Sequence, residues 1–92
     1  MTMFDFWLEM SNKIKSLDFG NNDITSSEVC QLINNMGYNA KNIPSQDNLI
    51  FIKGNQGQFY TILNPRLVVR VTKEQLELPW GQEMIREFEG VE

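Results

Sequence analysis

The sequence contains no histidine and a single cysteine, Cys30. Histidine is the commonest general base at neutral pH and the commonest metal ligand, so histidine-based catalytic triads cannot be built and zinc would have a poor ligand set. One cysteine cannot form an internal disulfide and is typical of a reducing compartment. The acid–base pair Glu83 with Glu87 stays open, but an exposed helix offers it no pocket. We predict a protein that is not an enzyme, with no cofactor and no metal, in which Cys30 is a buried structural thiol.

Long hydrophobic runs and clustered positive charge are also missing. No apolar stretch approaches the roughly 18 residues of a membrane span. The opening MTMFDFWLEM has acids where an export signal needs positive charge, so we expect a cytoplasmic protein with no membrane partner. The sequence contains eight scattered basic residues and twelve acidic ones, which gives a net charge of −4. This balance disfavours direct binding to nucleic acid, because phosphate binding depends on clustered Lys and Arg.

The chain has 92 residues and 41% hydrophobic content, which is enough for one folded domain over residues 1–92. Phe4 and Leu8 lie roughly 100–140° away from the main apolar stripe of the first predicted helix, residues 3–17, at 100° per residue. Either the rest of the subunit covers this second apolar face, or another chain does. Because so small a domain is only marginally stable, we predict a homodimer with Phe4 and Leu8 in its interface. The main stripe consists of Met3, Trp7, Met10, Ile14 and Leu17.

A second helix is predicted after the turn-rich stretch DFGNNDIT, residues 18–25. Thr25 and Glu28 have the spacing of a capping box at its start. Gly37 is expected in the left-handed conformation that often ends a helix.

From residue 48 the apolar period changes to two, which predicts strands over 48–53, 58–63 and 67–72. The loop GNQG joins the first two as a hairpin, and the turn NPR leads to the third. After a further turn, a last helix is predicted from Pro79, with an apolar side made of Trp80, Met84, Ile85 and Phe88. The predicted fold is α+β: two N-terminal helices, a three-stranded antiparallel meander and a C-terminal helix, with the helices packed on one face of the sheet.

Acidic residues are concentrated near the end of the chain, where six of the twelve follow residue 73. Glu83 and Glu87 stand one helical turn apart, and like charges at that spacing destabilise a helix by a few tenths of a kcal/mol. A helix C-terminus also disfavours carboxylates. The acids either form a solvated face that keeps a small protein soluble, or they imitate phosphates. The candidate phosphate surrogates are Asp5, Glu9, Glu74, Glu77, Glu83, Glu87 and Glu89.

The charge density of DNA decides how mimicry would have to work. Duplex DNA carries one charge per about 1.7 Å of its axis, so one subunit with a net charge of −4 is a poor copy. Mimicry then requires two subunits whose acidic faces merge into one surface.

The whole-chain character resembles the small early proteins of T-even bacteriophages. The resemblance lies in the length, the opening MTMFDFWLEMSNKIK, the Asn-rich middle NNDITSSEVCQLINNMGYNAKN and the acidic end. Among such proteins the chain is most similar to the Arn-type anti-restriction proteins, which are dimeric DNA mimics. That resemblance implies an inhibitor in the host cytoplasm, with the host restriction endonuclease McrBC and the nucleoid protein H-NS as partners. No signature motif defines these proteins, so it implies no site residue.

Two other interpretations remain. The first is a non-mimetic protein-binding module, such as a small chaperone, immunity or adaptor protein, whose apolar patch includes Phe4, Leu8, Trp80 and the sheet edge. The second is direct nucleic-acid binding through the basic residues of PRLVVRVTK, although Phe59 and Tyr60 of the neighbouring strand are more simply core residues. Those basic residues are Arg66, Arg70 and Lys73.

Overall fold

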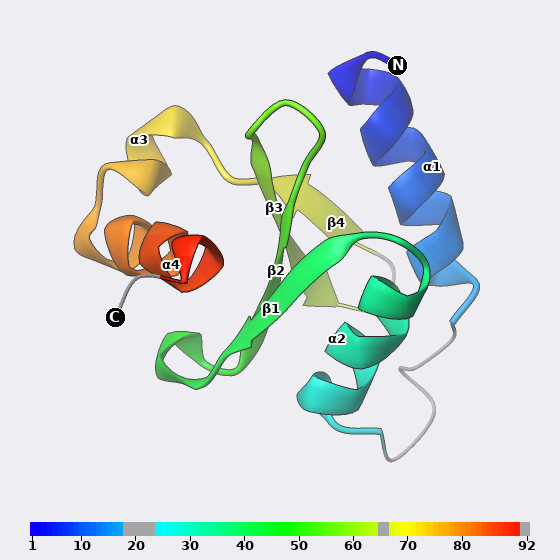
Figure 1. The fold of residues 1–92 in the computed structure, drawn as a ribbon, viewed down its shortest axis with the longest axis horizontal. Coiled ribbons are helices and arrows are strands. Elements are labelled where there is room, and N and C mark those ends of the chain that lie inside the picture. The colour runs from blue at the N-terminus through cyan, green and yellow to red at the C-terminus, as the bar shows by residue number, and fades with distance from the viewer. Residues whose placement is uncertain (18–23, 65–66, 91–92) are drawn as a thin grey trace.

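The computed structural model describes residues 1–17, 24–64 and 67–90, and these form an antiparallel sheet between two layers of helices (Figure 1). The four strands follow one another across the sheet in the order β1-β2-β3-β4. Helices α1 and α2 cover one face, and α3 and α4 cover the other. The elements are α1 (Met3–Lys15), α2 (Ser26–Asn35), β1 (Asn39–Ile43), the short 3-10 helix η2 (Pro44–Gln46), β2 (Leu49–Lys53), β3 (Phe59–Asn64), β4 (Leu67–Arg70), α3 (Lys73–Leu76) and α4 (Pro79–Glu89).

The predicted α+β class is confirmed, but three details of the predicted arrangement are wrong. The sheet has a fourth strand, β1, in which Ala40 is buried in one core and Ile43 in the other; the sequence did not predict it, because the segment is rich in Asn. A short helix, α3, occupies part of the expected turn before α4. Helices lie on both faces of the sheet rather than one, since both faces of its strands are apolar.

Strand register explains how one sheet supplies two cores. Successive side chains of a strand point to opposite faces. Ala40, Ile52 and Tyr60 form a row across β1, β2 and β3 on the α1–α2 face, and Arg70 of β4 ends that row. The alternate residues Phe51 and Phe59 belong to the core under α4. The predicted core positions of Phe59 and Tyr60 are therefore confirmed.

Each face has its own hydrophobic cluster, and burial of these side chains supplies most of the driving force for folding. On one face α1 and α2 pack Met10, Ile14, Val29, Cys30 and Ile33 against Ala40, Ile50, Ile52, Tyr60, Ile62 and Val68. On the other face Met84 of α4 packs against Ile43, Phe51, Phe59 and Val71.

At each edge of the sheet a side chain is hydrogen-bonded to the backbone of one edge residue. At the β1 edge, the Asn34 amide accepts a hydrogen bond from the Ala40 N–H at 2.7 Å and donates one to the Ala40 carbonyl at 3.1 Å. At the β4 edge, the Trp7 indole N–H donates to the Val68 carbonyl at 2.8 Å. Unpaired edge strands invite pairing with other chains, and such side-chain partners reduce that tendency.

Helix ends are set by local hydrogen bonds. The capping box of Thr25 with Glu28 is confirmed, and Gly37 has the expected positive φ of 98°. Helix α1 ends at Lys15, two residues before the predicted end, and it begins with a capping box that Thr2 forms with Asp5. The predicted break covers residues 18–25, and it lies outside the described residues apart from its last two positions.

Candidate partner-binding surfaces

The C-terminal acidic surface consists of five glutamates from α3, the residue that caps its end, and α4: Glu74, Glu77, Glu83, Glu87 and Glu89. The apolar side of α4 faces the sheet, where Trp80 lies 6.1 Å from Phe51 and Phe88 lies 5.2 Å from Phe59 between ring centroids. The predicted apolar side of α4 is thereby confirmed. Because an amphipathic helix buries one side only, the glutamates are directed away from the core.

The corner between α3 and α4 holds the two parts of this surface together. Thr72 and Gln75 form the capping box that starts α3, with hydrogen bonds of 2.8 and 3.1 Å. The Gln82 side chain of α4 donates to the carbonyl of Leu76 at 2.7 Å. Gly81 is buried where α4 meets the backbone of α3, and Pro79 stands at the start of α4 as predicted.

The five glutamates are not equivalent. Glu83 is half-buried and accepts hydrogen bonds from Ser45 and Gln46 of η2, both at 3.2 Å. It therefore helps to attach α4 to the β1–β2 connection. The other four glutamates are exposed. In the part of the chain that the structure describes, the one ion pair joins Glu9 to Lys13, so Arg86 and Glu83 form no ion pair although they lie three residues apart on α4.

Asp5 and Glu9, the other two candidate surrogates, belong to α1 on the opposite side of the sheet. The Asp5 carboxylate accepts a hydrogen bond from the Thr2 N–H at 3.4 Å as part of the capping box. Glu9 forms its ion pair with Lys13 at 2.9 Å, and the hydrogen bond to Glu9 is the main cause that raises the pKa of Lys13. One subunit thus brings five of the seven candidates together and leaves these two apart, each with a local structural role.

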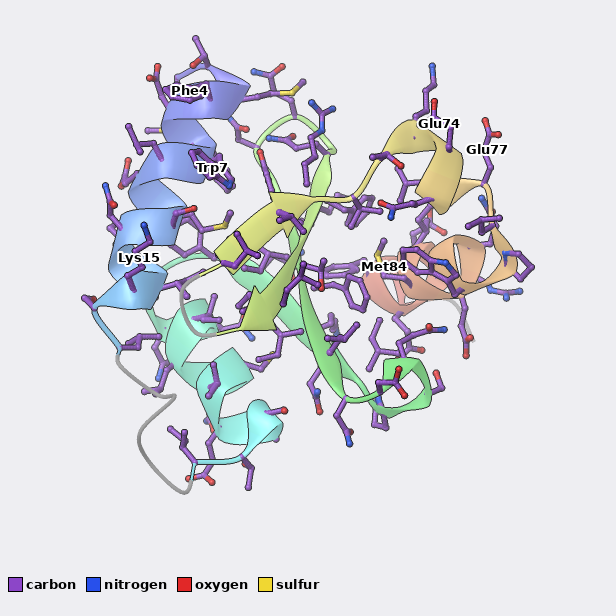
Figure 2. All side chains as sticks on the ribbon, turned by 180° about the vertical axis from the view of Figure 1, so that it is seen from behind. Phe4, Trp7, Lys15, Glu74, Glu77 and Met84 are labelled. Carbon is purple, nitrogen blue, oxygen red and sulfur yellow. The ribbon has the colours of Figure 1, made fainter. Side chains whose placement is uncertain are left out.

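Figure 2 shows the separation directly, because Phe4 and Trp7 lie on one side of the molecule and Glu74 and Glu77 lie on the other. Phe4 and Leu8 are exposed, at 64% and 43% of their surface, so the rest of the described subunit does not bury the second apolar face of α1. Trp80 belongs to α4 and packs against the core on the other face of the sheet. The apolar patch expected for a non-mimetic module is therefore divided between two sides of the molecule.

The basic candidates are spread over several positions. Arg70 is exposed at the end of β4, and Lys73 is the first residue of α3. Arg66 lies outside the described residues. Neither Arg70 nor Lys73 is accompanied by an exposed aromatic ring of the neighbouring strand, because Phe59 and Tyr60 are buried.

Cys30 is on the buried side of α2, in the core between this helix and the sheet, as predicted. Burial raises the pKa of its thiol, because the charged thiolate loses its hydration there. Among the described residues, no three Cys, Asp or Glu side chains gather in a group that could hold a metal ion. Within the same residues, no helix has both the length and the apolar character that crossing a membrane requires.

These features define a small α+β protein with a four-stranded antiparallel meander between two helical layers, an acidic surface on one side and an apolar surface on the other. No protein-family model, no curated protein and no solved structure matches the chain.

Proposed function

We propose that this protein is a phage-type inhibitor that acts as a DNA mimic, presenting the C-terminal acidic surface to the DNA-binding surface of a host protein. The observation that carries the proposal is the placement of four exposed glutamates, Glu74, Glu77, Glu87 and Glu89, on one helical layer. The restriction endonuclease McrBC and the nucleoid protein H-NS are the targets that the resemblance to anti-restriction proteins suggests.

The number of charges on this surface suits one DNA strand better than a duplex. Helix α4 has eleven residues and is therefore about 16 Å long at 1.5 Å per residue. One DNA strand carries a phosphate every 3.4 Å or so, which gives roughly five phosphates over that length. Helix α4 itself carries three carboxylates, and Glu74 and Glu77 bring the C-terminal acidic surface to five, although Lys73 and Arg86 reduce the net charge of residues 73–90 to −3.

Stability gives no reason for the carboxylates at the end of α4. Glu87 and Glu89 lie in its last turns, where the helix dipole favours cations and where Arg86 is the one basic residue. A placement that costs a few tenths of a kcal/mol per like-charge pair is better explained by binding to a basic surface.

Dimerisation has a different geometric consequence from the one expected from sequence. Phe4 lies on the side of the molecule opposite to Glu74, Glu77 and Met84 of the α3–α4 layer (Figure 2), and Leu8 belongs to the same helix as Phe4, α1. A two-fold pair formed through Phe4 and Leu8 therefore holds the two acidic surfaces at opposite ends instead of merging them into one. We accordingly assign the mimicry to each subunit by itself, and a homodimer through Phe4 and Leu8 would be a bivalent inhibitor.

The test is displacement of DNA from its binding protein. Purified H-NS is bound to a labelled duplex, and the concentration of inhibitor that releases half of the duplex is measured by fluorescence anisotropy. McrBC cleavage of a modified duplex provides the same measurement for the nuclease. The doubly substituted variant Glu87→Gln with Glu89→Gln loses two exposed charges, each worth about 0.2–1 kcal/mol, so we expect it to be roughly two- to thirtyfold weaker.

The matched control is Asp5→Asn with Glu9→Gln, which changes the net charge by the same amount on the other side of the sheet. We expect this variant to inhibit within about twofold of the natural sequence, because only long-range charge effects remain. Equal losses in the two variants, or no displacement from either target by the natural sequence, would contradict the proposal.

A further inference from the structure

A second surface, independent of the acidic one, lies on the other side of the sheet. A groove of about 580 Å³ runs between α1 and β4, within the range of roughly 300–1,000 Å³ that ligand sites have. We call it the α1–β4 groove. Its walls include Met3, Phe4, Trp7, Tyr60, Leu67 and Arg70.

Two polar side chains of this groove already have partners. The Trp7 indole N–H donates to the Val68 carbonyl at 2.8 Å, so the indole offers an occupant its apolar faces alone. The Tyr60 hydroxyl accepts a hydrogen bond from the buried Gln58 amide at 3.1 Å. Two apolar walls stay open to solvent, because Phe4 and Leu67 are exposed over 64% and 44% of their surface.

Two basic side chains, Arg70 and Lys73, lie at one end of the groove. Arg70 lines both the α1–β4 groove and an adjoining pocket of about 290 Å³, in which Lys73 and Gln56 also take part. Within the described residues, no carboxylate forms an ion pair with Arg70 or Lys73. The site therefore combines an apolar body with a cationic end, and guanidinium groups bind carboxylates especially well.

We propose that the α1–β4 groove binds a short segment of a partner protein in which large apolar residues are followed by acidic ones. The apolar side chains lie against Phe4, Trp7 and Leu67, and the carboxylates reach Arg70 and Lys73. The segment is held by its side chains, because Trp7 already occupies the Val68 carbonyl at the β4 edge and opposes pairing as an added strand there.

Two other occupants fit the geometry less well. A small amphipathic molecule is usually buried over about 70–90% of its surface, whereas the exposed walls leave one side of an occupant in water. A second copy of this chain in two-fold contact would place the groove against its own equivalent and bring two Arg70 side chains toward each other. An acidic segment neutralises that charge instead.

The experiment follows the two indole N–H signals of the nitrogen-15-labelled protein by NMR. Trp7 lines the groove and Trp80 lies under α4, and the variant Trp80→Phe assigns the two signals. The probe is the peptide acetyl-Leu-Phe-Leu-Asp-Asp-amide, and its charge-swapped twin ends in Lys-Lys. We expect the acidic peptide to shift the Trp7 signal in a saturable way and to leave the Trp80 signal in place.

Variants then separate the contributions of charge and shape. Arg70→Gln removes the exposed cation and should weaken the acidic peptide at least about threefold, while Arg86→Gln, the same charge change on α4, should alter its affinity by less than about twofold. Phe4→Ala removes an exposed wall without touching either core and should also weaken binding. The variant Glu87→Gln with Glu89→Gln should bind the peptide with unchanged affinity. The proposal for the groove and the proposal for the C-terminal acidic surface are therefore tested separately.

Three results would overturn the proposal. The first is equal binding of the Lys-Lys twin, because the cationic end would then have no role. The second concerns decanoate, a small amphipathic carboxylate. If decanoate binds more tightly than the peptide, and Arg70→Gln weakens both to the same degree, the groove is a site for small amphipathic molecules. The third is a Trp7 signal that moves with protein concentration alone, which would show that a second copy fills the groove.

Discussion

Gly81 is the position at which one methyl group should reveal how α3 and α4 are joined. A Cβ atom added to Gly81 would lie 2.7 Å from the Leu76 Cα atom and 2.8 Å from its carbonyl carbon, and it would also contact the Gln75 carbonyl oxygen. Comfortable contacts between carbon atoms are about 3.5–4.0 Å long. Since these neighbours are backbone atoms at the end of α3, no side-chain rotation can relieve the contact.

The size of the effect follows from two opposing contributions. Forcing a methyl group into a packed site usually costs about 1–3 kcal/mol. Replacing Gly by Ala inside a helix contributes up to about 1 kcal/mol in the opposite direction. We therefore expect Gly81→Ala to lower the free energy of unfolding by about 1–2 kcal/mol, which corresponds to a fall in Tm of roughly 5–15 °C for a domain of this size.

Urea and thermal unfolding followed by circular dichroism measure this change. Gln31→Ala, at an exposed position of α2, serves as the control and should change the stability by less than about 0.5 kcal/mol. Because Gly81→Ala pushes Glu74 and Glu77 away from α4, this variant should also displace DNA less effectively from its binding protein. A Gly81→Ala variant as stable as the natural sequence would refute the close approach of α3 and α4.

Three further predictions concern the rest of the fold. Trp7→Phe keeps an aromatic ring but removes the donor to the Val68 carbonyl, so urea unfolding should show a loss of about 0.5–1.5 kcal/mol in addition to the lost contact area. Thr25→Ala removes the capping box with Glu28 and should cost about 1 kcal/mol by the same measurement. Burial raises the pKa of Cys30, so the unfolded chain releases this proton at a lower pH than the folded one. The stability from this group is complete below the unfolded-state pKa of about 8.5, and is lost as the pH rises from there through the higher pKa of the folded state. Unfolding at about pH 7 and about pH 9.5 should therefore show a smaller alkaline loss for Cys30→Ala than for the natural sequence.

Helix α2 and the β2–β3 hairpin could be predicted from sequence because their signals are local. Thr25, Glu28 and Gly37 act within a few residues of one another, and the structure places all three as expected. The loop GNQG lies between two apolar segments of strand length, and the Gly54 N–H donates to the Gln58 carbonyl at 2.6 Å to close it.

Strand β1 could not be predicted from sequence, because it is stabilised by strand β2 and by the polar side chain of Asn34, which both lie outside the segment. Asn39, Lys41 and Asn42 have little strand propensity, and the segment gains its stability from pairing with β2 and from the Asn34 side chain. The residues of the segment themselves do not indicate pairing with either β2 or Asn34. The short helix α3 escaped for a similar reason, since a four-residue helix has no apolar period to detect, although Thr72 and Gln75 do have the spacing of a capping box.

The acidic residues could be identified from sequence, but their arrangement could not. Whether Asp5 and Glu9 join the C-terminal acidic surface depends on which face of the sheet α1 covers, and sequence periodicity does not specify that. Asp5 and Glu9 lie apart from the C-terminal acidic surface. We therefore propose that α3 and α4 of one subunit imitate DNA, instead of two acidic faces merged across a dimer. The contacts of Glu83 with Ser45 and Gln46 likewise depend on segments that are far apart in the chain.

The most direct test of the central claim is the salt dependence of binding between this protein and H-NS. Interactions between exposed carboxylates and basic side chains are screened by salt, so the affinity should fall at least about tenfold between about 50 and about 300 mM salt. The variant Glu87→Gln with Glu89→Gln should show a shallower dependence over the same range. An affinity that stays flat as salt rises, or a dependence that these substitutions leave unchanged, would contradict recognition through the C-terminal acidic surface.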